Sequence, residues 1–361
     1  METSFSRRSF LQTGLAAASV SFLDIRASGQ TSDRKLGVAV VGLGTLSTNQ
    51  IAPALQKTTN CRLSAIVTGT PAKARTWSEK YGIPEKNIYN YQTFDRIAEN
   101  PEIDIVYVVL PNSMHAEYTI RAARARKHVL CEKPMANSAK DCEAMIAACD
   151  KAGRQLAIGY RLHFEPANLE AKRLGQQKVF GNVRTIEAGF GFIIGDPTQW
   201  RLRKTLAGGG ALMDVGIYAL QAARYVSGEE PIEVTAIETK TDKVKFAEVD
   251  ETISFSLRFP SGVMANCGTS YNSNFNRLWA GAEKGWFELS PAYSYGGIKG
   301  RSSAGPLEFP QIDQFAAEID DFALCARSNR KSKVSGEEGL RDLRVIEAIY
   351  QSIRTGRTVK L

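Results

Sequence analysis

Residues 36–56, LGVAVVGLGTLSTNQIAPALQ, decide the fold of the first half of the chain. They begin with an apolar, β-branched run typical of a buried strand, pass through a glycine turn and continue with a helical pattern. Similar apolar runs that end in turns recur at CRLSAIVTGT (61–70), IDIVYVVLP (103–111) and KHVLCEKP (127–134), with helical stretches between them. Strands that alternate with helices form a parallel sheet covered on both faces. We therefore expect an α/β domain of the Rossmann type over residues 31–158.

The pattern changes after Gly159. In ETISFSLRFPSGVMANC (251–267), apolar residues occupy alternate positions before a Pro-Ser-Gly turn, which predicts an antiparallel hairpin with one face solvated or covered by helices. Near the C-terminus one helical stripe ends at Gly356. Its residues are Leu340, Leu343, Ile346, Tyr350 and Ile353. SYGGIKGRSSAGP (294–306) resembles a linker. We expect an α+β domain over residues 159–361 with a mostly antiparallel sheet and a C-terminal helix able to pack back on the first domain.

The charge and the cysteines exclude several classes of protein. The 361 residues include 46 Lys and Arg against 38 Asp and Glu, a net charge of +8, but the basic residues are spread along the chain and mixed with carboxylates. This pattern is typical of a soluble enzyme with an anionic cofactor, not of a protein that binds nucleic acid. The six cysteines form no CxxC pair or disulfide framework, and the three histidines have no metal-ligand spacing. We therefore expect buried thiols and no metal site.

Residues 1–30 resemble a twin-arginine export signal. Arg7 and Arg8 precede an uncharged apolar run, residues 10–23, that is shorter than the about 20 residues of a transmembrane helix. The alternative is a frayed basic terminus, which does not account for the match of SRRSFL to the signal pattern. Signals of this kind export folded proteins. We therefore expect a periplasmic protein, without a membrane anchor, that folds around its cofactor before it leaves the cell.

The glycine turn after the first strand is suited to a dinucleotide. Gly42, Gly44, Thr45 and Leu46 bring the backbone close to a pyrophosphate at a helix N-terminus, with Ser47 as the third small residue. A GxG turn can also be a plain tight connection. Its position in a βαβ series favours cofactor binding.

The end of the second strand indicates which dinucleotide binds. NAD sites end this strand with Asp or Glu, whereas this chain has a hydroxyl, free backbone amides, a helix that begins at Pro71 and an ammonium. The residues that supply these groups are Thr68, Gly69, Thr70 and Lys73. They suit a 2′-phosphate, so we expect NADP(H). An ordinary helix start with a surface lysine would explain the lysine but not the missing acid.

Three further stretches carry side chains for chemistry: PNSMH (111–115), CEKPMA (131–136) and QWRLRKTLAGGGALMDVGIYAL (199–220). Strand C-termini face the ligand in an open α/β sheet, so we expect the first two stretches to line the nicotinamide. The residues concerned are Pro111, Asn112, His115, Glu132 and Lys133. Pro134 fixes the chain direction there and is a candidate for a cis bond. Asp214 and Tyr218 are four residues apart, so they share a helix face that can meet the lysine. Taken alone, such a lysine can be a surface residue, and such a tyrosine a core residue.

Together these stretches resemble the Gfo/Idh/MocA oxidoreductases, and within that family the periplasmic glucose-fructose and aldose-aldose oxidoreductases. The resemblance also runs through GYRLHFEP (159–166), SGEEP (227–231) and EGLRDLRVIEAIY (338–350), and so covers nearly the whole chain after the signal. It implies a second domain built on a large open sheet, which packs against another subunit in a dimer or tetramer. It also implies tightly held NADP and a Lys/Tyr pair that acts on a sugar.

The resemblance assigns roles to individual residues. The residues implied for catalysis are Lys133, Asp214 and Tyr218. Those implied for cofactor binding are Trp200, Arg201 and Arg161. The sugar is expected to contact the three catalytic residues together with Tyr160 and Arg161. Many family members carry histidine at the position of Tyr218, and the glucose-fructose subgroup carries tyrosine.

The chemistry of aldose oxidation is consistent with these roles. A base has to remove the anomeric proton while hydride passes to the nicotinamide. Bringing a phenol from its reference pKa of about 10 to about 7 takes roughly 4 kcal/mol, which a lysine charge at about 4 Å supplies and a helix dipole does not. We expect Tyr218 to transfer the proton and Lys133 to activate Tyr218 and bind the substrate oxygen. We expect Asp214 to orient one of these two side chains or a sugar hydroxyl.

An exported dehydrogenase has little free NADP to draw on, so we expect ping-pong chemistry. One aldose is oxidised to its lactone, and a second sugar carbonyl takes the hydride. Only residues 27–34 separate the signal from the first strand, whereas the glucose-fructose subgroup has a long arm over the cofactor. Retention of NADP then depends on contacts inside the domain. Two alternatives remain: an NADP-dependent sugar dehydrogenase that exchanges its cofactor, and an exported sugar-binding protein with a vestigial cofactor site.

Overall fold

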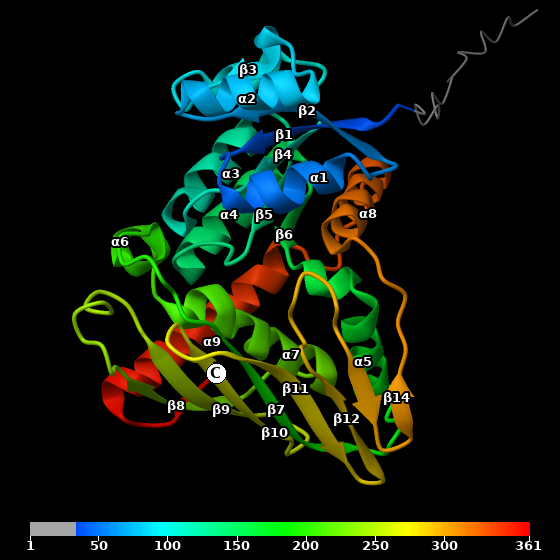
Figure 1. Ribbon diagram of the computed structural model, residues 1–361, viewed down its shortest axis with the longest axis vertical. Coiled ribbons are helices and arrows are strands. Elements are labelled where there is room, and N and C mark those ends of the chain that lie inside the picture. The colour runs from blue at the N-terminus through cyan, green and yellow to red at the C-terminus, as the bar shows by residue number, and fades with distance from the viewer. Residues whose placement is uncertain (1–33) are drawn as a thin grey trace, which may run out of the picture. The chain divides into compact units, whose positions relative to one another are not determined.

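The computed structural model describes residues 34–361, so the expected export signal lies outside the described residues. The first half of this range forms a six-stranded parallel sheet in the order β3-β2-β1-β4-β5-β6 (Figure 1). Its strands are β1 (Leu36–Val41), β2 (Cys61–Val67), β3 (Ile88–Tyr89), β4 (Ile105–Val108), β5 (His128–Glu132) and β6 (Leu156–Gly159). The four apolar runs of the sequence contain β1, β2, β4 and β5, which confirms the predicted Rossmann-type α/β sheet.

Helices pack against this sheet and cover its central strands. They are α1 (Ala52–Leu55) and α2 (Pro71–Tyr81) on β2, α3 (His115–Arg124) on β4 and β5, and α4 (Ala139–Ala152) on α3. Every residue of β1 and β4 is buried. Strands covered on both faces have no solvated side, so they show continuous apolar runs and no alternation.

The second half forms a nine-stranded sheet in the order β14-β13-β12-β11-β7-β10-β9-β8-β15. Its strands are β7 (Val183–Gly191), β8 (Glu233–Thr239), β9 (Thr252–Arg258), β10 (Met264–Ser270), β11 (Phe275–Ala282), β12 (Gly285–Leu289), β13 (Gly300–Ser302), β14 (Gly305–Leu307) and β15 (Val359–Lys360). Among these described strands only β7 and β10 pair in parallel. The mostly antiparallel sheet and its β9-β10 hairpin are therefore confirmed.

Helices cover one face of the second sheet (Figure 1). The helices of this half are α5 (Pro166–Gln176), α6 (Lys204–Ala207), α7 (Ile217–Ser227), α8 (Gln314–Ser328) and α9 (Gly336–Thr355). In β9 the buried residues Ile253, Phe255 and Leu257 alternate with Ser254 and Ser256. The period-two pattern thus separates a helix-covered face from an open one.

The two C-terminal helices also contact the first sheet. Helix α8 packs on β2 and α1, while α9 packs on α4 and β6 as well as on β8. As predicted, α9 ends at Gly356, whose φ of 63° is a left-handed conformation that favours glycine. None of the helices in residues 34–361 has both the length and the hydropathy needed to cross a bilayer.

The linker prediction for residues 294–306 is wrong. This segment contains β13 and the first two residues of β14, an antiparallel pair that extends one edge of the second sheet. Each strand has three residues. Strands of this length are too short to show a hydrophobic period, so the prediction depended on the composition of the segment, which resembles that of a linker.

Helix α8 carries a carboxyl group into the core beside the first sheet. Glu318 is 1% exposed, and neither of its carboxyl oxygens has a hydrogen-bond partner in the described part of the chain. Burial raises the pKa of Glu318 well above its ordinary value, and the carboxyl of Glu132 raises it further, although Arg161 opposes this. Glu318 therefore favours the protonated, uncharged form.

Replacing Glu318 by methionine is expected to stabilise the protein increasingly as the pH rises above about 4.5. The unfolded chain ionises this carboxyl near its ordinary pKa, whereas the folded chain keeps it protonated to a higher pH. The wild type therefore loses up to about 1.4 kcal/mol of unfolding free energy per pH unit until the raised pKa is reached, and the variant does not. Urea unfolding between about pH 4.5 and pH 8 measures the difference, with Glu79→Met at an exposed position of α2 as control. Parallel pH profiles for the wild type and Glu318→Met would contradict the prediction.

Candidate active site

A cleft of about 490 Å³ opens where β1, β4 and β5 end and is closed on its other side by the start of α7. Eleven of the predicted site residues line it: Gly44, Thr45, Leu46, Asn112, Glu132, Lys133, Arg161, Trp200, Arg201, Asp214 and Tyr218. The glycine turn and the candidate catalytic residues, which are far apart in the sequence, therefore meet in one cleft.

Lys133 reaches this cleft from the end of β5, where its peptide bond to Pro134 is cis. Its ammonium donates hydrogen bonds to the backbone oxygen of Asp214 (2.6 Å) and to Asp214 Oδ1 (3.0 Å), and lies 4.9 Å from the centre of the Tyr218 ring. Burial alone would lower the pKa of Lys133, but Tyr218, Asp214 and Glu132 raise it above its ordinary value. Lys133 therefore remains a cation beside the phenol at physiological pH.

Asp214 joins two cations. It lies in a π-helical turn (Leu212–Gly216) that runs into α7. Oδ1 accepts from Lys133, and Oδ2 accepts from Arg201 Nε (3.0 Å) and from the Tyr271 hydroxyl (2.9 Å). Burial opposes ionisation, but Lys133 and Arg201 hold the pKa of Asp214 below its usual range. Because two cations share one carboxylate, the cluster of Lys133, Asp214 and Arg201 carries a net positive charge.

Tyr218 is held by rings and by cations. Its ring centre lies 5.7 Å from that of Phe190 and 6.0 Å from that of Tyr293, which is nearly parallel to it. The guanidinium of Arg161 lies 5.1 Å from the same ring, in addition to the ammonium of Lys133. Packing thus fixes the phenol in the cleft, next to two positive charges.

The glycines before the π-helical turn allow two parts of the chain to approach closely. A Cβ at residue 210 would lie 2.0 Å from the backbone oxygen of Asp250. The Asp250 carboxylate accepts hydrogen bonds from the N–H groups of Gly210 (2.7 Å) and Leu212 (2.8 Å) and from the Tyr350 hydroxyl (2.7 Å). These bonds anchor the turn that carries Asp214 to helix α9.

The glycine turn after β1 has the geometry of a close-approach loop. Gly42 has φ of 92°, and a Cβ there would lie 2.2 Å from the backbone oxygen of Val109. The Ser47 hydroxyl donates to the backbone oxygen of Gly42 (2.5 Å) and closes the turn. In residues 34–361, no atom outside Gly44 and its two chain neighbours lies within 4 Å of the position that a Cβ on Gly44 would take. The backbone at Gly44 therefore borders open space in the cleft, as a loop that approaches a pyrophosphate requires.

The predicted phosphate seat lies at the end of β2, apart from the residues that line the cleft. Residues 69–73 are exposed and lead into α2, which has proline in its first turn. The Thr70 amide donates to Thr68 Oγ1 (3.2 Å), so it is not free as the sequence suggested. The segment has no carboxylate and keeps the amide of Gly69 and the ammonium of Lys73. This donor set fits a 2′-phosphate.

His115 and Pro111 do not line the cleft, contrary to prediction. Both ring nitrogens of the fully buried His115 bond to backbone oxygens, those of Pro134 and Leu110, at 2.9 Å each. Burial lowers the pKa of His115. The side chain therefore joins the two strand-end segments and supports the cleft from behind. Within residues 34–361, the His, Cys, Asp and Glu side chains form no group that could hold a metal ion. All six cysteines are buried and unpaired, as predicted.

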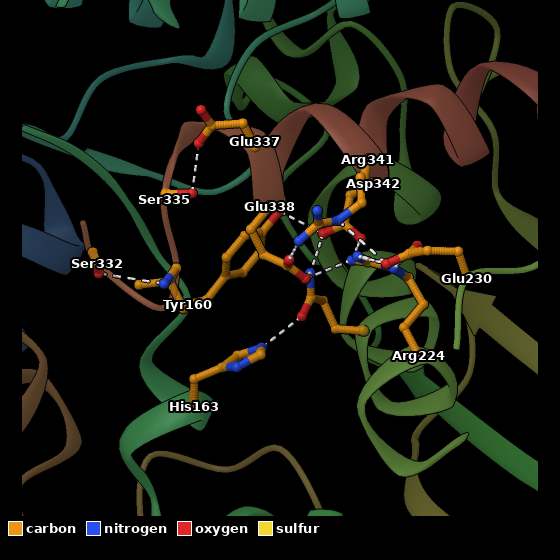
Figure 2. A network of polar contacts seen from close by, with 12 residues as sticks. Tyr160, His163, Arg224, Glu230, Ser332, Ser335, Glu337, Glu338, Arg341 and Asp342 are labelled. Carbon is orange, nitrogen blue, oxygen red and sulfur yellow. Dashed lines mark hydrogen bonds and ion pairs between the residues drawn. The ribbon is translucent and has the colours of Figure 1, made fainter. Parts of the chain in front are cut away.

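Tyr160 does not border the cleft either. Its hydroxyl donates to Asp342 Oδ2 (2.5 Å) within a buried polar network (Figure 2). In this network the Arg224 guanidinium pairs with Asp342 (2.6 Å) and Glu338 (2.7 Å). Figure 2 shows these side chains pointing toward one another between α7 and α9. The sequence motif was found correctly, but the neighbouring Arg161, not Tyr160, faces the cleft.

Sequence reasoning missed seven residues that line the cleft: Asn49, Gln50, Val109, Leu110, Gln199, Tyr295 and Phe315. The first five are close in the sequence to predicted motifs, and this position is the signal that could have identified them. Tyr295 and Phe315 come from segments that only tertiary packing brings to the cleft.

Family models match most of the chain. "Oxidoreductase family, NAD-binding Rossmann fold" matches residues 36–160, "GFO/IDH/MocA C-terminal domain" matches 168–288, and "Oxidoreductase family, C-terminal alpha/beta domain" matches 307–361.

Individual proteins are similar over almost the same extent. The chain is 53% identical to an aldose-aldose oxidoreductase from Caulobacter crescentus, crystallised with glycerol, with a TM-score of 0.89 over 91% of this chain and 100% of that one. It is 31% identical to a D-xylose 1-dehydrogenase (NADP(+)) of Haloarcula marismortui, over 91% of this chain and 94% of that protein. A second such dehydrogenase, from Haloferax volcanii, is 29% identical over 89% of this chain and 98% of its own length. The chain belongs to the Gfo/Idh/MocA family of oxidoreductases.

Proposed function

We propose that this oxidoreductase oxidises an aldose at C1 to its lactone and passes the hydride, through tightly bound NADP, to the carbonyl of a second sugar. The observation that carries the proposal is the cluster of Lys133, Asp214 and Tyr218 in one cleft with the glycine turn. The 53% identity to an aldose-aldose oxidoreductase supports the use of two sugars, and the NADP-dependent xylose dehydrogenases support the choice of cofactor.

In this proposal the protein's side chains hold and transfer one proton. Bound NADP would supply the hydride acceptor, and Gly42, Gly44 and Lys73 would hold its phosphates. Tyr218 takes the proton of the anomeric hydroxyl in the first half-reaction and returns it to the second sugar. Lys133 donates a hydrogen bond to the reacting oxygen of the sugar.

Arg201 keeps Lys133 effective. A cation paired with a single carboxylate would lose most of its influence on a neighbouring phenol. Here Arg201 shares Asp214 with Lys133, so one positive charge of the cluster stays uncompensated. The Lys133 ammonium lies 4.9 Å from the centre of the Tyr218 ring. At an effective dielectric constant near 20, a unit charge about 5 Å from a phenolate oxygen stabilises the phenolate by about 3 kcal/mol. This energy is close to what a phenol needs to act as a base near neutral pH.

A half-reaction experiment tests the proposal. The purified protein, with no NADP added, is mixed with an aldose, and absorbance at 340 nm is followed. We expect a rise equivalent to one reduced cofactor per subunit, which falls again when a second sugar is added. A rise that needs added NADP supports the exchanging dehydrogenase, which the xylose dehydrogenase relatives favour. No change with any aldose, with or without added NADP, supports a sugar-binding protein.

We also propose that the protein assembles as a dimer or tetramer through the second sheet. The face opposite α7 carries a hollow of about 550 Å³, away from the active site and lined in part by the exposed side chains of Ile237 and Phe275. Exposed apolar side chains gathered on one face are typical of an interface. Native mass spectrometry reports the subunit number and any bound nucleotide together.

Export to the periplasm in the folded state is likewise part of the proposal. Its support is the SRRSFL motif in residues 1–30. A protein that retains NADP also has a reason to fold before export. Fractionation of cells that express the full chain tests this localisation.

A further inference from the structure

The guanidinium of Arg161 connects three separate segments. Arg161 follows β6 and is 3% exposed. Its Nη2 donates to the backbone oxygen of Tyr293 (2.6 Å), and its Nη1 donates to the backbone oxygen of Ser294 (3.2 Å) and to Gln314 Oε1. Three of its five N–H groups, all on the two Nη atoms, are therefore used to hold these segments, while the buried Nε has no hydrogen-bond partner in residues 34–361.

The same guanidinium lies between two phenol rings. It is 5.1 Å from the ring centre of Tyr218 and 4.6 Å from that of Tyr295. Cation–π contacts of this kind are stronger when they are shielded from water. Arg161 thus fixes the distance between the tyrosine assigned to proton transfer and a tyrosine at the rim of the cleft.

Tyr295 belongs to a loop, residues 291–297, whose first half makes most of its hydrogen bonds, while at its end the Gly297 amide donates one long bond to Gln311 Oε1 (3.5 Å). Asn276 Oδ1 accepts from the N–H groups of Ala292 (2.7 Å) and Tyr293 (2.9 Å), and Gln314 Nε2 donates to the backbone oxygen of Ser294 (3.1 Å). Tyr295 itself is 54% exposed and lines the cleft. Two glycines follow it in the sequence.

We propose that Arg161 is a positioning residue that holds the 291–297 loop against Tyr218 and so sets Tyr295 as a wall of the sugar pocket. The inference rests on the proposed function and departs from the expectation that Arg161 contacts the cofactor. A half-exposed phenol ring has a flat apolar face and a polar end, which suits a sugar ring with C–H bonds on its faces and hydroxyls at its rim. Arg161 then controls how a sugar lies over Tyr218 without binding NADP itself.

Arg161→Lys is the variant that tests this role. Lysine keeps the positive charge beside Glu132 and Glu318. It lacks the planar guanidinium, so it cannot donate hydrogen bonds to two backbone oxygens in the same geometry or stack on the aromatic rings in the same way. We expect KM for the aldose to rise by roughly 10-fold or more, because at least one bond to a charged donor is lost. The dissociation constant for NADP, measured by titration, should stay within about 3-fold of the wild-type value, because the proposal gives Arg161 no contact with NADP. A tenfold loss of affinity would correspond to about 1.4 kcal/mol of lost contact.

Asn276→Ala is the matched variant, because it loosens the same loop from the other side and does not line the cleft. It should raise KM for the aldose in the same way. Hydrogen exchange of the 291–297 loop should become faster in both variants, and this readout does not depend on activity. If the wild type were inactive but both variants still showed faster exchange than the wild type, the proposed function would be refuted and the clamping of the loop would not. A loss of NADP affinity in Arg161→Lys equal to the rise in KM, or unchanged exchange in the loop, would overturn the inference.

Discussion

Tyr218→Phe is expected to lower turnover with an aldose by at least roughly 100-fold while NADP still binds. Phenylalanine keeps the ring that packs against Phe190 and Tyr293, so the cleft retains its shape. Only the oxygen that takes the anomeric proton is lost. Lys133 cannot replace it, because its neighbours raise its pKa and it remains protonated. The rate of the 340 nm change in a single turnover measures the effect.

Tyr225→Phe is the control for this experiment. Tyr225 lies on the same helix, and its hydroxyl donates to Asn168 Oδ1 (2.6 Å) away from the cleft. Loss of this buried hydrogen bond should cost about 1 kcal/mol of stability and leave turnover near that of the wild type. Near-full turnover of Tyr218→Phe with normal NADP binding would remove the tyrosine from the mechanism.

The sequence predicted those parts of the fold that local patterns determine. Continuous apolar runs gave β1, β2, β4 and β5, and a period of two gave β9. The helical stripe that ends at Gly356 gave α9. The edge strands β13 and β14 were missed, because β13 is stabilised by pairing with β12, β14 by pairing with β13, and their own three residues show no period.

The candidate site shows the same division between local and long-range information. The spacing of Asp214 and Tyr218 placed both side chains in the cleft. The error at Tyr160 arose because its partner, Asp342, is 182 residues away in the sequence. His115 was misplaced for a related reason, since its two acceptors come from the ends of different strands. A single sequence predicts which residues carry chemistry better than it predicts which neighbours satisfy their polar atoms.

Lys133→Met is expected to have the largest effect on activity, a fall in turnover of roughly 1,000-fold or more. The change removes about 3 kcal/mol of charge stabilisation from the phenolate and also a charged hydrogen bond to the sugar oxygen, worth about 1.5–3 kcal/mol. A phenol without a neighbouring cation is a base only in alkaline solution. Single-turnover rates at neutral pH measure the loss.

Lys127→Met separates this catalytic role from a structural one. Lys127 is a buried lysine just before β5, and its ammonium donates to the backbone oxygen of Asn100 (2.9 Å) outside the cleft. Both variants should lose stability, and Lys133→Met should lose more because Asp214 then keeps Arg201 as its only cation. Only Lys133→Met should lose turnover beyond the fraction that unfolds. If its rate instead followed the folded fraction, Lys133 would serve only to neutralise Asp214, and the phenol would have to be activated by the guanidinium of Arg161.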